Sequence, residues 1–132
     1  MQVFLSYSHN DEGFARALTE QLEKHGLSVW SAADEILPGE NFWQRIGTAL
    51  KESKAMIVLL SPESVRSETQ QREIDYVLGD PKYQGRVFPV QVKPTQDIPW
   101  ILRTLNLLDA KQGAAKVGAS IAEAAKSTLS TK

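Results

Sequence analysis

Cysteine is absent from the 132-residue sequence. Its absence excludes a disulfide, a thiolate nucleophile and a zinc site built on cysteine. Histidine is scarce as well, since His9 and His25 are the only two, and their spacing matches no metal-binding motif. We therefore expect no metal site, with His9 in a loop and His25 near a helix end.

The sequence also lacks an excess of one charge and a long apolar stretch. Its formal net charge is −1, so no overall field would attract nucleic acid or an anionic membrane surface. No stretch approaches the roughly 18 apolar residues of a membrane span. The first residues lack the basic flank and apolar run of a signal peptide. We expect a cytoplasmic protein that binds neither nucleic acid nor membranes.

Common phosphate-binding motifs are missing too. Neither G-x-G-x-x-G nor G-x-x-x-x-G-K-[ST] occurs, which argues against a Rossmann dinucleotide site and a P-loop. A phosphoacceptor receiver domain would need an aspartate at the end of its third strand, where this chain has Ser61. We therefore reject that class as well.

Short apolar runs alternate with helical periodicities along the chain. The runs at 3–5, 27–30, 55–60, 87–92 and 105–108 predict five strands. The run at 55–60 is apolar throughout, which is typical of a central parallel strand buried on both faces. Pro89 cannot donate to a ladder, so its strand is expected near an edge or at a bulge. Helical spacing is found in four apolar sets: Phe14, Leu18 and Leu22; Ile46, Ala49 and Leu50; Ile74, Val77 and Leu78; and Val117 and Ile121, within an Ala-rich helix over 114–129.

This alternation predicts an α/β domain with a flavodoxin-like fold. We expect a five-stranded parallel sheet of order 2-1-3-4-5 with helices on both faces. Ligands of such sheets lie beyond the C-terminal strand ends, where the winding reverses between strands one and three. Here those ends are 6–10 and 61–64. The length fits one domain, at 1–126, followed by a tail or the start of a linker at 127–132.

Four motifs, in this order and spacing, resemble the Toll/interleukin-1 receptor (TIR) family, most closely its bacterial members. They are Phe4-Leu5-Ser6-Tyr7-Ser8, Ile36-Leu37-Pro38-Gly39-Glu40, the strand at 55–60 with Ser61-Pro62, and Ser67 followed by Glu73-Ile74. The resemblance spans about residues 2 to 125. Many TIR domains cleave NAD⁺ between nicotinamide and ribose, whereas others act only as self-associating adaptors.

The resemblance implies that Glu73 is the catalytic residue, because Ser67 and Glu73 match the Ser-x-x-x-x-x-Glu pattern of the family. A carboxylate can stabilise the oxocarbenium-like ribose that forms when nicotinamide leaves, with NAD⁺ as substrate and no cofactor or metal. The alternative is a solvated carboxylate on a charged outer face, beside Arg72. Because Glu73 precedes Ile74 by one residue, it lies about 100° away around the helix. We therefore expect it at the border of the buried face, exposed enough that its loss barely changes stability.

The positions that the resemblance places around the substrate are Phe4, Tyr7, Ser8, Asp34, Trp43 and Thr69. Two of them, Thr69 and Ser8, depart from the family pattern, because an aromatic residue is common at the first position and a basic residue at the second. Ala32 is a third departure, since it occupies a position that is often acidic, although Asp34 and Glu35 follow it. Tyr7, Trp43 or Phe42 would have to replace the aromatic wall. A packing role for Trp43 is the alternative, because an aromatic residue on a helix usually faces the core.

The resulting hypothesis is an NAD⁺ glycohydrolase, with cyclisation as a further option, that becomes active on self-association in a bacterial immune or stress response such as antiphage defence. The loop Leu37, Pro38, Gly39 and Glu40 would mediate homotypic TIR–TIR assembly, controlled by a sensor domain that is fused or on a separate chain. The rival hypothesis is a non-catalytic TIR–TIR interaction module.

Overall fold

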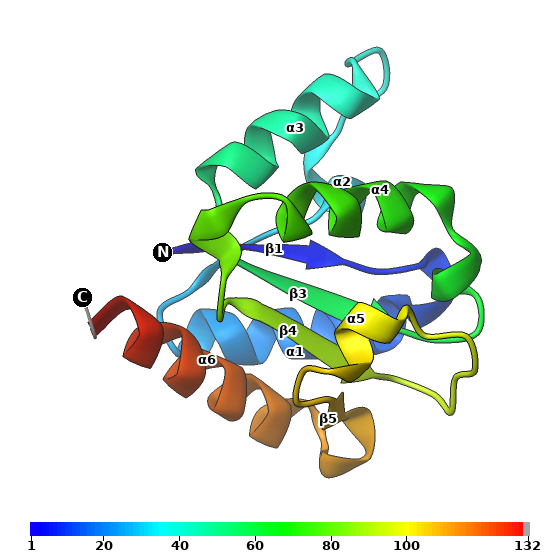
Figure 1. The fold of residues 1–132 in the computed structure, drawn as a ribbon. Coiled ribbons are helices and arrows are strands. Elements are labelled where there is room, and N and C mark those ends of the chain that lie inside the picture. The colour runs from blue at the N-terminus through cyan, green and yellow to red at the C-terminus, as the bar shows by residue number, and fades with distance from the viewer. Residues whose placement is uncertain (131–132) are drawn as a thin grey trace.

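A parallel sheet of five short strands organises the fold in the computed structural model, which describes residues 1–130 (Figure 1). The strand order is β2-β1-β3-β4-β5 and every pair is parallel, so the predicted topology is confirmed. The strands are β1 (Gln2–Ser6), β2 (Ser28–Trp30), β3 (Ala55–Leu60), β4 (Val87–Gln91) and β5 (Leu108–Asp109). The α-helices are α1 (Glu12–Lys24), α2 (Ala32–Glu35), α3 (Phe42–Glu52), α4 (Glu68–Leu78), α5 (Trp100–Arg103) and α6 (Ala114–Ser130). Short 3₁₀ turns are η1 (His9–Asp11), η2 (Ser64–Arg66), η3 (Pro81–Tyr83) and η4 (Ala110–Gln112).

The sheet separates two apolar layers. Helices α1 and α6 cover one face, while α3, α4 and α5 cover the other (Figure 1). All six residues of β3 are buried, because alternate side chains enter each layer: Ile57 and Leu59 face α1 and α6, and Met56 and Val58 face the other helices. The prediction that 55–60 forms a central buried strand is confirmed.

Pro89 occupies a position in β4 where its missing N–H matters little. The backbone groups of Arg86 and Val92 bond to β3. Because successive residues of a strand direct their backbone N and C=O groups to opposite sides, those of Pro89 point toward β5 instead. Strand β5 pairs with β4 from Val90 onward. The strand therefore lies next to the sheet edge, as the proline predicted.

Several boundaries differ from the sequence-based expectation. The fifth strand begins at Leu108, because Leu105 N bonds to Leu102 O and 105–107 belong to the turn after α5. The segment expected to be a loop at 31–41 contains α2, whose end is stabilised by Arg45 donating to Glu35 O. Helix α6 extends through 127–130, which we expected to be tail. The remainder of that tail, 131–132, lies outside the described residues.

Helix α4 is rotated relative to the prediction. Its buried residues are Gln70, Glu73, Ile74 and Val77, which follow the i, i+3, i+4, i+7 spacing of one helical face. The expected third member of the apolar face, Leu78, is exposed at the end of the helix. This rotation turns Glu73 inward, so the expectation that it lies at the border of the buried face, exposed enough to be lost at little cost, was wrong.

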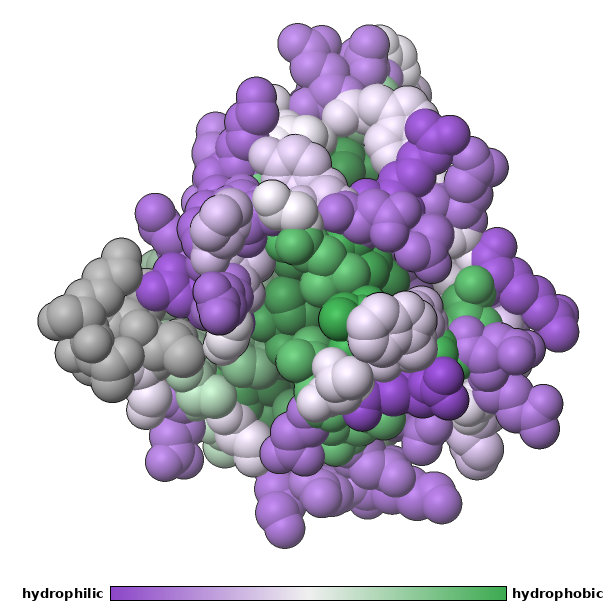
Figure 2. Space-filling view, in the orientation of Figure 1, coloured by the Kyte–Doolittle hydropathy of each residue, from purple (hydrophilic) through white to green (hydrophobic). Residues whose placement is uncertain are grey.

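A second feature of the α4 layer is an apolar surface groove. Figure 2 shows hydrophobic residues gathered at the surface between α4 and α5, where Val77, Leu78, Ile101 and Leu105 line a hollow of about 380 Å³. Within residues 1–130, no helix is long and apolar enough to cross a membrane.

Candidate active site

Glu73 lies at the centre of the candidate site. Its side chain is only 5% exposed, and its Oε1 accepts a hydrogen bond of 2.6 Å from the hydroxyl of Ser6, which is 3% exposed. Ser6 is the last residue of β1, so the contact joins a sheet end to α4. A carboxylate is thus held at the C-terminal edge of the sheet, where ligands of this fold bind.

Local sequence explains why α4 presents Glu73 here. Ser67 caps the N-terminus of the helix, because its side chain accepts from Gln70 N at 3.2 Å and so satisfies one of the free N–H groups of the first turn. One turn before Glu73, Gln70 Nε2 donates to Leu59 O at 3.1 Å and reaches Ser6 O at 3.5 Å. The helix is therefore tied to the ends of both β1 and β3.

A cavity of about 300 Å³ opens above this contact. Its wall combines the end of β1 and the start of η1 and α1 with residues of α2, α3 and α4. The lining residues are Leu5, Ser6, Tyr7, Ser8, His9, Glu12, Ala32, Ala33, Phe42, Ser67, Thr69, Gln70 and Glu73. Four of the seven catalytic and substrate-binding candidates predicted from sequence are therefore brought together: Tyr7, Ser8, Thr69 and Glu73.

The other three candidates do not line this cavity. Phe4 is 1% exposed and stacks on Trp30 with ring centroids 5.2 Å apart, so it supports the floor as a core residue. Asp34 lies in a neighbouring hollow, where its Oδ2 accepts from Ser31 Oγ at 3.1 Å. These positions correct the expectation that both residues face the substrate cavity.

Trp43 was expected either to wall the substrate site or to pack in the core. It is 45% exposed, so the core alternative is wrong. Its ring lies 5.3 Å from the guanidinium carbon of Arg72, in a smaller cavity of about 200 Å³ that also borders Glu73. Trp43 and Tyr7 thus line different cavities that both border Glu73, and Phe42 is the aromatic residue that α3 places in the main cavity.

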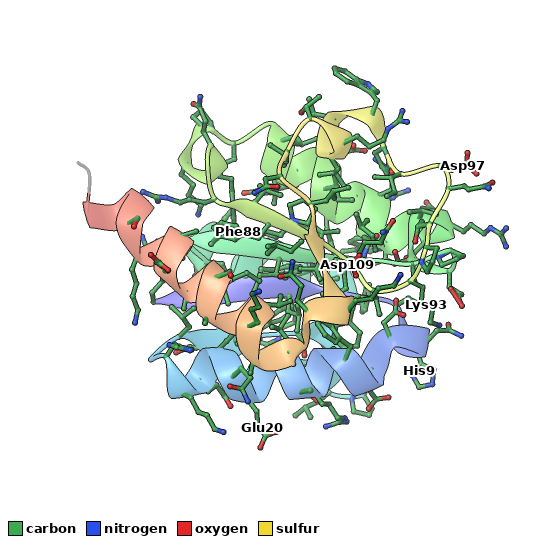
Figure 3. All side chains as sticks on the ribbon, turned by 90° about the horizontal axis from the view of Figure 1, so that it is seen from below. His9, Glu20, Phe88, Lys93, Asp97 and Asp109 are labelled. Atoms are coloured by element: carbon green, nitrogen blue, oxygen red, sulfur yellow. The ribbon has the colours of Figure 1, made fainter. Side chains whose placement is uncertain are left out.

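The end of β3 differs from expectation. The predicted ligand segment 61–64 is closed by its own hydrogen bonds: Ser61 Oγ donates to the buried carboxylate of Asp11 at 2.5 Å, and Ser64 Oγ accepts from Ser61 N at 2.9 Å. Lys93 Nζ lies 3.9 Å from the same aspartate. Figure 3 places Lys93 and His9 at the same end of the molecule, where β1, β3 and β4 finish. Of these residues, His9 lines the cavity, whereas Asp11, Ser61, Ser64 and Lys93 do not.

The electrostatics of the cavity centre on Glu73. Burial raises the pKa of its carboxyl from 4.5 to about 7, and the hydrogen bond from Ser6 opposes that rise. Burial also raises the pKa of Tyr7, against a hydrogen bond involving Ser31. A carboxylate in such a poorly solvated place is strongly stabilised by a cation brought next to it. The arrangement therefore suits a substrate that is cationic or becomes so.

The sequence matches the model of a known protein family. The family model described as "TIR domain" matches residues 3–124.

The chain belongs to the TIR domain family.

Two curated relatives of this TIR domain are named for NAD⁺ chemistry. It is 30% identical over 89 residues to a probable 2′ cyclic ADP-D-ribose synthase of Methanobrevibacter olleyae, covering 67% of this chain and 26% of the relative. It is 36% identical over 74 residues to an NAD⁺ hydrolase of a Theionarchaea archaeon, covering 55% and 22%. The matched segments thus span only about a quarter of the length of these relatives.

Solved structures show the same fold. The TIR domain of a Toll-related receptor from Hydra magnipapillata superposes with a TM-score of 0.72 at 21% identity, over 86% of this chain and 87% of that one. A TIR-STING receptor from C. gigas gives a TM-score of 0.74 at 26% identity, over 93% and 39%. An archaeal flavodoxin gives 0.58 at 20% identity, over 96% of this chain and 99% of that one, which reflects the shared flavodoxin-like topology.

The predicted assembly loop of the TIR domain is a tight exposed turn. Glu40 N bonds to Leu37 O at 3.1 Å, with Pro38 and Gly39 between them, and Gly39 has φ +90°. Proline followed by a glycine of positive φ is typical of a type II turn. Glu40 braces the turn by accepting from Leu37 N at 2.8 Å, and the Leu37 side chain is 64% exposed. The turn thus presents an apolar side chain on a fixed backbone.

Sequence reasoning missed Ser6 and Gln70. Ser6 was treated only as part of a family motif, but strand alternation carries a signal: it shares a sheet face with Phe4, on the side covered by α4. Gln70 lies one turn before Glu73, so an inward Glu73 places it on the same face. Both could have been found once the rotation of α4 was known.

Proposed function

We propose that this TIR domain cleaves the bond between nicotinamide and ribose in NAD⁺. The proposal is based on the Glu73 carboxylate, which lines the cavity, is buried and is held by Ser6. Relatives named as an NAD⁺ hydrolase and a cyclic ADP-ribose synthase support it.

The reaction suits a single carboxylate. When the C–N bond breaks, its electron pair goes to the ring nitrogen, so nicotinamide leaves as a neutral molecule and the ribose becomes an oxocarbenium-like cation. An ionised Glu73 stabilises that charge, and the poor solvation that raises its pKa strengthens the attraction. Water then adds at the anomeric carbon and releases a proton, which gives ADP-ribose. Attack by a hydroxyl of the same nucleotide gives a cyclic product instead.

The size of the cavity supports a role for self-association. At about 300 Å³, it lies at the lower end of the range for ligand sites, so it suits the nicotinamide-ribose half better than a whole dinucleotide. We propose that a second TIR domain, docked through the loop Leu37, Pro38, Gly39 and Glu40, covers the remainder of the substrate. A sensor domain, fused or separate, would control this clustering in a cytoplasmic immune or stress response such as antiphage defence.

A non-catalytic TIR–TIR interaction module is the second candidate. It is favoured by Thr69, which lines the cavity where many relatives in the family pattern have an aromatic residue. Such a module would use the exposed Leu37 turn without needing Glu73.

Nicotinamide release separates the two functions. The chain would be incubated with NAD⁺ in dilute solution and again clustered through a terminal histidine tag on nickel-bearing vesicles, with products separated by chromatography. The enzyme hypothesis predicts release that rises steeply on clustering. A clustered chain that self-associates but releases no nicotinamide would establish the interaction module instead.

A further inference from the structure

The hydroxyl of Ser6 is directed at Glu73. Ser6 ends β1, is buried, and faces the α4 layer together with Phe4. Its Oγ donates to Glu73 Oε1 at 2.6 Å, a short separation typical of a hydrogen bond to a charged acceptor. The Ser6 carbonyl faces Gln70 Nε2 at 3.5 Å, so main chain and side chain both contact α4.

The hydrogen bond from Ser6 gives the two carboxylate oxygens of Glu73 different surroundings. Oε1 is engaged by Ser6, whereas no hydrogen bond to Oε2 is found within residues 1–130, and Glu73 lines the cavity. We propose that Ser6 is a positioning residue, whose hydroxyl fixes the Glu73 carboxylate and favours its charged form while leaving Oε2 for the substrate. For its consequence in catalysis, this inference rests on the proposed function.

The surroundings of Glu73 make its pKa sensitive to the hydrogen bond from Ser6. The titratable residues that line the main cavity with Glu73 are Tyr7, His9 and Glu12, and those that line the smaller cavity with it are Arg72 and Tyr76 of α4. The causes that act on the pKa of Glu73 are burial, which raises it, and the Ser6 hydrogen bond, which lowers it. Removing the hydroxyl therefore leaves burial unopposed, and the pKa must rise further.

The direct test needs no catalytic turnover. Side-chain carboxyl carbons of glutamate would be labelled with ¹³C and titrated by NMR, with Glu73→Gln used to assign the Glu73 signal. Ser6→Ala should move its midpoint upward by about one pH unit. Ser6→Cys keeps a weaker donor of similar size, so its Glu73 midpoint should lie between those of the parent and Ser6→Ala. It also provides a second measurement if Ser6→Ala fails to fold.

Ser61→Ala is the matched control. Ser61 is also a buried serine at a strand end that donates to a carboxylate, but its partner is Asp11. It should lower stability without moving the Glu73 midpoint. An unchanged midpoint in both Ser6 variants, or an equal shift in Ser61→Ala, would overturn the inference.

Activity provides the second arm. With the clustered chain, Ser6→Ala should shift the rise of nicotinamide release to higher pH by the same interval, so that the rate below pH 7 falls about tenfold and recovers at alkaline pH. A titration shift without any NAD⁺ cleavage in the parent would retain the positioning role and reject the proposed function. A rate loss that is equal at every pH would reject the role of Ser6 in ionisation.

Discussion

Replacing Glu73 by glutamine removes a charge but preserves the size of the side chain and its ability to accept from Ser6. In the folded protein the carboxyl has a pKa of about 7, against 4.5 in the unfolded chain. Because the folded value is raised, the folded state binds the proton more tightly, and the associated stability is present below pH 4.5 and is lost as the pH rises through 7. Ionised Glu73 therefore destabilises the fold.

The size of this destabilisation follows from the difference between the two pKa values. A difference of about 2.5 pH units at 1.36 kcal/mol each is worth about 3 kcal/mol. At pH 8, Glu73→Gln should thus raise the unfolding free energy by up to about 3 kcal/mol, or the melting temperature by roughly 10 °C. Near pH 4.5 the variant and the parent should differ little.

Urea unfolding followed by circular dichroism at pH 4.5 and pH 8 measures both values. Glu68→Gln is the matched control, because Glu68 lies on the same helix but is exposed and paired with Arg72; it should change stability by a few tenths of a kcal/mol at either pH. Equal stabilities of Glu73→Gln and the parent at pH 8 would contradict this prediction, since they would show that burial costs the ionised carboxylate nothing.

Three other outcomes are expected. Nicotinamide release by the clustered chain should increase as the pH rises through about 7, because the ionised form of Glu73 is the active one; a rate that falls over that interval would contradict it. Gly39→Val should leave the monomer folded but weaken self-association in light scattering, because a β-branched residue is strained at φ +90°, although a Cβ there meets open space. Tyr83→Phe should lower the unfolding free energy by about 1–2 kcal/mol in urea, since the buried carbonyl of Leu50 loses its donor; an unchanged value would show that this bond is replaced by water.

Most of the fold could be predicted because its strongest signals are local. The run at 55–60 is uniformly apolar, and only a strand buried on both faces explains that pattern in a chain of alternating elements. Helix α2 and strand β5 were harder to predict, since they comprise four and two residues and are too short to show a periodicity. The end of α2 also depends on a hydrogen bond from Arg45, which lies outside the helix, in α3.

The candidate site was predicted less completely than the fold. Tyr7, Ser8, Thr69 and Glu73 meet as expected, but the burial of Glu73 was missed, because a charged residue beside Arg72 has the same local pattern whether it faces solvent or a serine 67 positions away. Burial decides both its pKa and its cost to stability. The burial of Glu73 depends on the contact between β1 and α4, which a local sequence pattern does not reveal.

The role of Glu73 in NAD⁺ cleavage can be measured directly. Nicotinamide release would be measured at pH 8 with the clustered parent, Glu73→Gln and Glu68→Gln, at equal degrees of clustering. Loss of a carboxylate that stabilises the ribosyl cation should lower the rate of Glu73→Gln by hundreds- to roughly thousand-fold, while Glu68→Gln stays near the parent. A Glu73→Gln chain that releases nicotinamide at close to the parental rate would contradict the account.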